Sequence, residues 1–202
     1  MVKAQDTEKQ ILDAARRVFI RKGLSGARMQ EIADEAGINK ALLHYYFRSK
    51  EKLFDVILKE TFAKIFPSPP DLMMNQQLTF RESLTKFVDG YITAIQHNPF
   101  LPAFVINEIN QNPDKIAQVF ETIGFDGAKI KQVQEVLPQR LGLSKEKTRE
   151  VIVTVISLCV FPFVGKPVLK TLLFDNDDKA FEAFLEERKA RVIEIAMSMI
   201  QS

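Results

Sequence analysis

The chain has 202 residues, 46% of them hydrophobic, with 8 glycines and a single cysteine. This length suits one sizeable helical core plus a small satellite domain, and the lone Cys159 excludes an intramolecular disulfide and favours a reducing compartment. The net charge is +2, but residues 1–50 carry +4 and residues 51–202 carry −2. A basic N-terminal part beside a mildly acidic remainder is compatible with a modular nucleic-acid-binding protein.

The first segment predicts a loose polar tail followed by an amphipathic helix. Met1–Asp6 is polar and lacks the features of a secretory signal, and Asp6 or Thr7 is the expected helix cap. An apolar stripe then continues until Lys22 and Gly23, where we expect the helix to close. Lys9, Arg16 and Arg17 lie on the opposite face, most of which we interpret as a solvated charged surface.

Two short helical patterns then meet at a tight turn. Ile32, Ala33 and Ala36 form a small apolar face that ends at Gly37, and Asn39 can cap a second helix from Lys40 to about Phe47. On this second helix Leu43 and Phe47 are expected to face inward. The remaining surface is short, basic and aromatic, and consists of Lys40, Leu42, His44, Tyr45 and Tyr46. Such a surface suits a helix that enters the major groove of DNA.

A longer apolar helix follows and is expected to belong to two parts of the chain. Ser49 is its predicted cap, and apolar residues continue at three- and four-residue spacing to Phe66. The sequence PSPPD, Pro67–Asp71, is expected to end it, because proline cannot continue a helix. This helix, at about 50–66, would join a small head to a larger body mechanically.

Residues 67–202 predict further helices and no strand of useful length. Apolar stripes mark helices at about 79–98, 100–111, 116–123, 130–141, 144–174 and 177–200, with the fifth bent or broken near Pro162 or Gly165. The most apolar run, Val151–Gly165, is too short to cross a bilayer and is interpreted as a buried helix. The fold class is therefore all-α, and no membrane association is expected.

Four short sequence blocks occur in the N-terminal part of the chain in a characteristic order and spacing. They are ILDAARRVFIRKG, EIADEAGI, HYYF and SKEKLF, between Ile11 and Phe54. This region resembles the DNA-binding domain of the TetR family of bacterial repressors. The resemblance implies a helix-turn-helix head at 1–50, a connecting helix at 51–66 and a helical effector-binding and dimerisation domain at 67–202. It further implies a cytoplasmic homodimer that pairs through its two C-terminal helices and binds a roughly palindromic operator.

The chain departs from the family pattern at three places. Family members usually open the first helix of the motif with two hydroxyl residues, whereas Ala27 and Arg28 stand here. The loss of a capping hydroxyl costs about 1 kcal/mol unless another residue substitutes. Along the second helix, Ala41, His44 and Tyr46 replace the usual Gly, Tyr and His. Both rings can still hydrogen-bond phosphate, and which of them does so stays open.

The candidate DNA-binding residues divide by expected role. Lys40, Leu42 and Tyr45 are candidates for base contacts, and Leu42 could meet a thymine methyl group. The phosphate candidates are Arg28, His44, Tyr46 and Lys50. Asn39, at the start of the second helix of the motif, is the remaining DNA-binding candidate. For the effector pocket, the resemblance directs attention to the aromatic residues of the body, namely Phe87, Tyr91, Phe104, Phe120 and Phe161.

Other functions have less support in the sequence. The sequence contains no phosphate loop, nucleophile elbow, paired His-Glu metal motif or dinucleotide turn, so no motif indicates an enzyme. No cofactor is expected. His97 has no second His or Cys at metal-ligand spacing, so we interpret it as a surface or capping residue. A helical ligand carrier, an activator, and a regulator that answers to a protein are the alternatives. The effector's identity and the operator sequence are not encoded in any motif.

Overall fold

The computed structural model describes residues 2–65, 69–98, 101–122 and 127–201. Within these ranges the secondary structure is helical throughout, which confirms the all-α expectation. The helices are α1 (Val2–Gly26), α2 (Met29–Glu35), α3 (Lys40–Tyr46), α4 (Lys50–Ile65), α5 (Pro69–Met74), α6 (Phe80–Gln96), α7 (Leu101–Gln111), α8 (Pro113–Thr122), α9 (Gly127–Leu141), α10 (Lys145–Val164), α11 (Lys166–Leu173) and α12 (Asp178–Gln201).

The chain forms two compact units, and three of the described helices contribute residues to both. Unit 1 comprises Met1–Phe62 and Ile106–Val119, and unit 2 comprises Ala63–Val105 and Phe120–Ser202. The boundaries fall inside α4, α7 and α8. No local sequence pattern indicates that part of α7 or α8 belongs to a distant unit.

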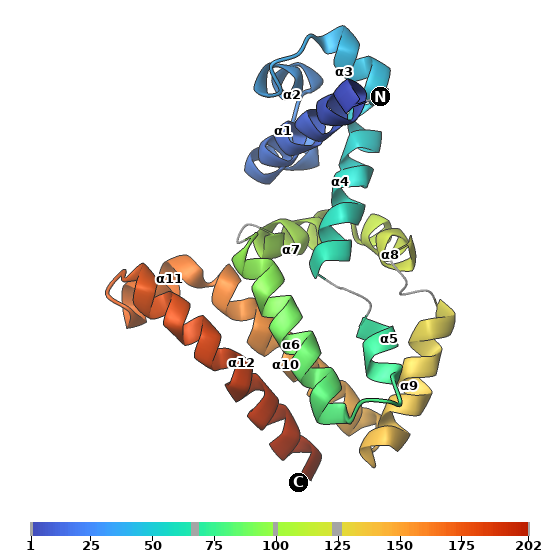
Figure 1. Cartoon of the computed structure of the whole chain (residues 1–202), viewed down its shortest axis with the longest axis vertical. Helices are drawn as coiled ribbons and strands as arrows, with labels where there is room; N and C mark the ends of the chain where they lie inside the picture. Colours follow the sequence, from blue (N-terminus) through green and yellow to red (C-terminus); the bar gives the residue numbers. More distant parts are fainter. Residues whose placement is uncertain (1, 66–68, 99–100, 123–126, 202) are drawn as a thin grey trace. The chain divides into compact units, whose positions relative to one another are not determined.

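In unit 1, helices α1, α2 and α3 gather around the N-terminal part of α4 (Figure 1). Their apolar side chains form a dense core in which Ile32, Leu43 and Leu53 have no exposed surface. Phe19 of α1 meets Phe54 of α4 edge to face, with ring centroids 5.0 Å apart. This T-shaped arrangement is favourable for aromatic pairs and ties the first helix to the fourth.

Helix α1 begins earlier than the sequence indicated. It starts at Val2, so the expected loose tail with a cap at Asp6 or Thr7 is wrong. The predicted closure is confirmed, since Gly23 has φ 65° and breaks the regular helical path inside the residues assigned to α1. Glycine adopts this left-handed conformation without the steric cost that a side chain would impose.

The proline-rich segment contains a helix that the sequence analysis did not expect. Helix α4 extends to Ile65, while Phe66 and the first two residues of PSPPD lie outside the described residues. Helix α5 then begins at Pro69 and continues to Met74. Prolines are tolerated in the first helical turn, where backbone N–H groups have no intrahelical acceptor, so these prolines start a helix as well as preventing the previous one from continuing.

Unit 2 is built around the packing of α6, α10 and α12 (Figure 1). Thr79 begins α6 with a reciprocal cap: its hydroxyl accepts from Glu82 N at 3.2 Å, and Glu82 Oε2 accepts from Thr79 N at 2.7 Å. Ser144 caps α10 in the predicted way, accepting from Lys147 N. The break after α10 falls at Gly165, where α11 turns by 76°, while Pro162 stays inside α10.

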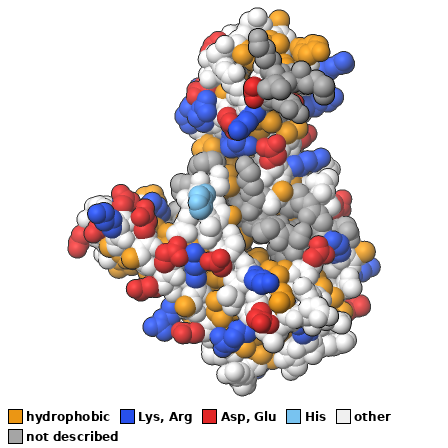
Figure 2. Space-filling model, viewed as in Figure 1, with side chains coloured by type: hydrophobic (Ala, Val, Ile, Leu, Met, Phe, Trp, Pro, Cys, Tyr) orange, Lys and Arg blue, Asp and Glu red, His pale blue; other side chains and the backbone are white. Residues whose placement is uncertain are grey.

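Apolar side chains remain at the surface of unit 2. Phe161, Val168, Leu172 and Leu173 of α10 and α11 are each at least 60% exposed. Figure 2 shows apolar side chains interspersed with charged ones on the visible face of the molecule. No single described helix is long and apolar enough to span a bilayer, although α10 and α11 together pass that test by length and composition.

Candidate nucleic-acid interface and effector cavity

The corner between α2 and α3 has the geometry that its sequence predicts. Gly37 has φ 64°, and Ile38 N donates to Ala33 O at 3.0 Å, which ends α2. Asn39 Oδ1 accepts from Leu42 N at 2.8 Å and so caps α3. From α1, Gln10 Nε2 donates to Ala36 O at 2.7 Å and satisfies a carbonyl at the end of α2. The direction of α3 is therefore set by glycine geometry and side-chain hydrogen bonds together.

Helix α3 presents the side chains that the sequence placed on its outer surface. Leu43 is fully buried, whereas Lys40 and His44 are exposed and Tyr45 is 80% exposed. Leu42 is 37% exposed, and Tyr46 is half-buried with its ring edge to face against that of Tyr45, at 5.5 Å. A large aromatic residue with 80% exposure contributes little to a core, so its role must be sought outside the unit.

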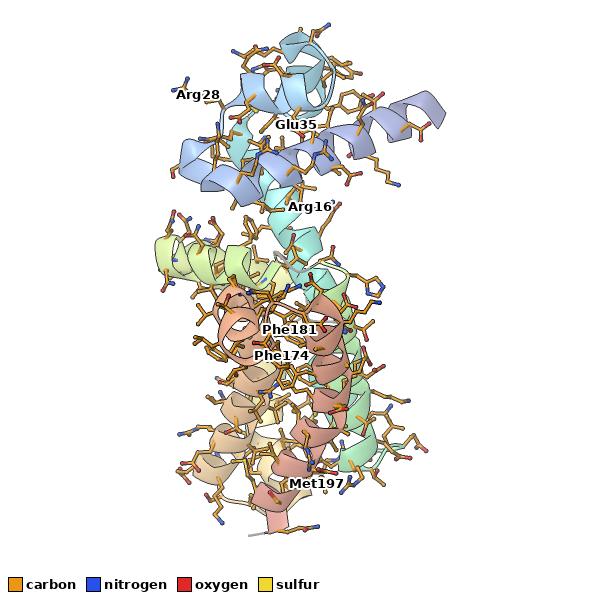
Figure 3. The ribbon with its side chains drawn as sticks, turned by 90° about the vertical axis from the view of Figure 1, so that its left-hand side faces the viewer. Arg16, Arg28, Glu35, Phe174, Phe181 and Met197 are labelled. Atoms are coloured by element: carbon orange, nitrogen blue, oxygen red, sulfur yellow. The ribbon has the colours of Figure 1, made fainter. Side chains whose placement is uncertain are left out.

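Arg28 and Lys50 lie at the turn that leads into α2. Arg28 occupies the N-cap position of α2 without a capping hydrogen bond from its side chain, as expected from the absent hydroxyl. Its side chain is exposed and projects away from the ribbon (Figure 3). Lys50 is half-buried, and its Nζ donates to Ala27 O at 3.1 Å. One of the three ammonium protons is thus used within the head, which leaves two for another acceptor.

Three arginines of α1 form ion pairs within the head. The expected solvated face holds for Lys9 and Arg17, which stay exposed, but not for Arg16, whose side chain is 17% exposed. Arg17 Nε and Arg21 Nη2 each lie 2.8 Å from a different oxygen of Glu35 in α2. The hydrogen bonds from Arg21 and then Arg17 lower the pKa of the Glu35 carboxyl. Arg16 lies between α1 and α4 (Figure 3), where it pairs with Glu60 at 2.8 Å. These cations hold the helices of the head together.

Arg48 is a further exposed cation of the head, and it was not predicted as a DNA-binding residue from the sequence. It is exposed, and it lies between buried Phe47 and the α4 cap, Ser49. Ser49 Oγ accepts from Lys52 N at 3.2 Å, so α4 begins immediately after Arg48. A cation beside a helix N-terminus can cooperate with the free backbone N–H groups in binding an anion. The position of Arg48 directly before the SKEKLF block is the sequence signal from which this residue could have been predicted.

Unit 2 contains a cavity of about 470 Å³. Its wall is formed by residues of α5, α6, α8, α9 and α10, which are Met73, Phe80, Leu84, Phe87, Phe120, Ile130, Val133, Gln134, Leu137, Leu141, Val151, Ile152, Val155 and Ile156. The volume lies within the range of small-molecule sites in proteins. All of these residues except Gln134 are apolar.

The five aromatic residues predicted for a pocket are placed differently from one another. Phe87 and Phe120 belong to the cavity wall, whereas Tyr91 and Phe104 are buried and are not part of it. Phe161 is also absent from the wall and is 60% exposed. The reason is helical geometry, because α10 directs Val151 and Val155 to the cavity and carries Phe161 on another face.

Helix α5 forms part of the wall through Met73 and is attached to α9 at two points. Arg140 Nη1 donates to Met73 O, and Arg140 Nη2 donates to Leu78 O. Nearer the start of α9, Lys129 Nζ lies 3.1 Å from Asp71 Oδ1. The sequence analysis named none of these residues, because the contacts join segments 58 to 67 residues apart.

Buried Cys159 and Tyr91 lie within the body without belonging to the cavity wall. Cys159 has no exposed surface, which confirms its interpretation as a small buried hydrophobe, and burial raises its pKa to about 12. Burial also raises the pKa of Tyr91. A thiol with a raised pKa is a poor nucleophile, since the thiolate is the reactive form.

Comparison with known proteins identifies the head. Residues 11–57 match the model of the family described as bacterial regulatory proteins, tetR family. The chain is 30% identical over 111 residues to the HTH-type transcriptional repressor NicS of Pseudomonas putida, an alignment that covers 54% of this chain and 51% of NicS. Residues 11–57 therefore belong to the TetR family. The matched segment lies entirely within unit 1 and contains the exposed surface of α3.

A second curated relative is similar over a shorter stretch of the chain. It is 43% identical to the HTH-type transcriptional regulator RutR of Escherichia coli, but only over 53 residues, or 26% of this chain and 25% of RutR. The chain thus spans about half of NicS and a quarter of RutR in these alignments.

Solved structures extend the likeness to the whole fold. A crystal structure of HlyIIR, a hemolysin II transcriptional regulator, has a TM-score of 0.64 at 24% identity and covers 95% of this chain and 97% of that one. A TetR transcription regulator from Haloarcula marismortui has a TM-score of 0.59 at 20% identity, with coverage of 96% and 98%. At these identities the likeness establishes the all-α architecture with its N-terminal helix-turn-helix domain and does not transfer a ligand.

Proposed function

We propose that this protein is a dimeric transcriptional repressor that binds operator DNA through α3 and is released by a small apolar effector. The observation that carries the DNA-binding part is the exposure of Lys40, His44 and Tyr45 on a capped helix whose opposite side is buried. A helix with this combination presents donors and rings to the solvent in a fixed direction, as a recognition helix requires. The match of residues 11–57 to the family supports the same role.

Each candidate DNA-binding residue of the head has a proposed role. Lys40, Leu42 and Tyr45 read base edges, and Arg28, His44, Tyr46 and Lys50 bind phosphates. Arg48 adds a phosphate contact at the start of α4. Asn39 acts chiefly by capping α3, since its side-chain oxygen already accepts from Leu42 N at 2.8 Å.

In the proposed dimer, two recognition helices together supply the DNA-sequence specificity that one short helix cannot provide alone. Two heads that reach successive major-groove faces, about 34 Å or a multiple of it apart, would read a roughly palindromic site. The exposed apolar side chains of α10 and α11, namely Phe161, Val164, Val168, Leu172 and Leu173, support a pairing surface that includes the C-terminal helices. Contiguous exposed apolar surface is a common sign of a protein interface.

The cavity is the proposed effector site. Filling it would change the packing of α5, α6, α9 and α10, and α4 and α7 contribute residues to both units, so they can transmit the change. A coupling of about 1–3 kcal/mol between effector and DNA is the usual size of such an effect. The effector then lowers DNA affinity, and repression is relieved.

The DNA-binding proposal is tested with the DNA upstream of the protein's own coding region. Fluorescence anisotropy over a range of salt concentrations should detect saturable binding with a negative salt slope. Lys40→Ala should weaken sequence-specific binding, and Tyr46→Phe or Lys50→Ala should weaken binding and reduce the salt slope. If neither Tyr46→Phe nor Lys50→Ala alters affinity or slope, the phosphate assignments are wrong. A ligand carrier, in contrast, would bind no DNA in this assay.

A further inference from the structure

The cavity wall has a chemical character that narrows the class of ligand. Gln134 is the single polar residue among the described wall residues, and polar atoms make up almost none of the wall surface. No Asp, Glu, Lys, Arg or His belongs to the described wall. An ionised group placed inside would lose its hydration without gaining a partner, which is strongly unfavourable. The described wall therefore selects against charged ligands.

The size of the cavity limits the ligand further. Its volume is about 470 Å³. Because a water molecule occupies about 30 Å³ of liquid volume, this space corresponds to about fifteen water-sized groups. A ligand that fills most of it has about 10 to 15 non-hydrogen atoms. This size matches a medium-length hydrocarbon chain or a substituted aromatic ring and is too small for a nucleotide.

The shape of the wall can adapt to such a ligand. Phe80, Phe87 and Phe120 contribute flat rings, and Met73 contributes a flexible thioether that fills irregular gaps. Ile152 and Ile156 at the edge of the cavity are each 36% exposed, so their apolar surface has no protein partner on one side. A ligand that contacts these atoms restores the dispersion interactions that the empty space lacks.

We propose that the cavity binds an uncharged, hydrocarbon-like compound of about 10 to 15 non-hydrogen atoms and rejects carboxylates and alkylammonium ions of the same length. A single neutral polar group, such as a hydroxyl, is accommodated at Gln134, the one amide of the wall. The inference rests on the proposed function only for the ligand's regulatory role. The binding itself requires no DNA.

The test uses the purified full-length protein and 4-(dimethylamino)benzonitrile, an uncharged dye of the proposed size whose fluorescence changes in apolar surroundings. Decan-1-ol, decanoate and decylammonium are compared as competitors at pH 7. Decan-1-ol should displace the dye at a concentration about a hundredfold or more below that of either ion. From hexan-1-ol upward, affinity should rise about fourfold for each added methylene and stop rising once the cavity is full. Displacement by decanoate as effective as that by decan-1-ol overturns the proposal.

Two matched substitutions on α10 locate the binding. Val155 is 5% exposed and belongs to the wall, whereas Val153 is 62% exposed and lies outside it. Val155→Phe should fill part of the cavity and weaken decan-1-ol binding at least tenfold, and Val153→Phe should leave binding unchanged. Ile152→Phe, at the edge of the same wall, is the second variant if Val155→Phe does not fold. Unchanged binding in a folded wall variant would place the ligand elsewhere and contradict the proposal.

The effector role is tested separately with operator DNA. Binding of decan-1-ol without any change in operator affinity supports the ligand class and contradicts the proposed release mechanism. Operator binding by a protein that takes up none of the alcohols contradicts the ligand class and leaves the DNA-binding role intact. Failure of the proposed ligand class and failure of the proposed release mechanism therefore give different results.

Discussion

The two units are stabilised in different ways, and the difference matches what each is proposed to do. The head packs the two short helices α2 and α3 against α1 and α4, and ion pairs such as those of Arg17 and Arg21 with Glu35 join them around a densely buried core. Unit 2 packs apolar faces of its helices around about 470 Å³ of unfilled space. A unit that presents side chains to a rigid partner needs fixed geometry, whereas a unit that responds to a ligand needs space whose filling adds stability.

The largest expected effect is the loss of a ring from the head. Phe54→Ala removes a side chain with no exposed surface and ends its edge-to-face contact with Phe19 at 5.0 Å. We expect a loss of about 3–5 kcal/mol in the free energy of unfolding, measured by circular dichroism in urea. Phe80→Ala, at the cavity wall, should cost clearly less, because that ring already borders empty space. Equal losses would show that the two units are packed alike.

A smaller effect is expected from the attachment of α5. Arg140→Met retains the length of the side chain but removes both donors to Met73 O and Leu78 O. A loss of about 1–3 kcal/mol in the free energy of unfolding should follow, together with weaker dye binding to the cavity. Lys129→Met is the control, since it removes an exposed ion pair with Asp71, and such pairs are worth about 1 kcal/mol or less. Equal behaviour of the two variants would contradict a special role for Arg140.

Within the head, the cap of α3 should contribute about as much as a typical helix cap. Asn39→Ala removes the acceptor for Leu42 N and should lower stability by about 1 kcal/mol, detected as a lower melting temperature. Asn39→Asp retains an acceptor and should retain stability, but its negative charge beside α3 should weaken DNA binding. If Asn39→Asp binds DNA as tightly as the natural protein, Asn39 does not lie near the phosphates.

The smallest expected effect depends on pH. The pKa of Glu35 is lowered by Arg21 and Arg17, so its stabilising contribution is present above its unfolded-state value of 4.5 and is lost as pH falls through the lower folded-state value. Glu35→Gln should therefore be less stable than the natural protein near pH 7, and the difference should shrink toward pH 3. Thermal unfolding at several pH values measures this. Glu187→Gln, an exposed change in α12, controls for the general effect of removing a carboxylate.

Several elements of the head could be predicted because their causes are local. Gly37 with φ 64°, the Asn39 cap and the inward position of Leu43 all depend on residues within one or two helical turns. The outward position of Tyr45 follows from the same helical period. A short stretch of sequence therefore contained the information for both the corner and its exposed surface.

Features that join distant segments could not be predicted in this way. Arg16 was expected on a solvated face because nothing near it in the sequence indicates that Glu60 lies within 2.8 Å. Phe161 was expected to line a pocket and is instead 60% exposed, since its helix is rotated to direct other residues inward. Helix α5 was missed because prolines were considered only as helix terminators.

By itself, the sequence determined the helical periods, the caps and the glycine corner of the head, because hydrogen bonds and backbone geometry within a few residues decide them. It also contained the family blocks between Ile11 and Phe54. Only the tertiary structure decided which apolar side chains meet, where Arg140 attaches α5, and that an uncharged wall surrounds an unfilled space in unit 2. Apolar packing is non-directional, so a stripe of hydrophobic residues specifies burial without specifying its partner.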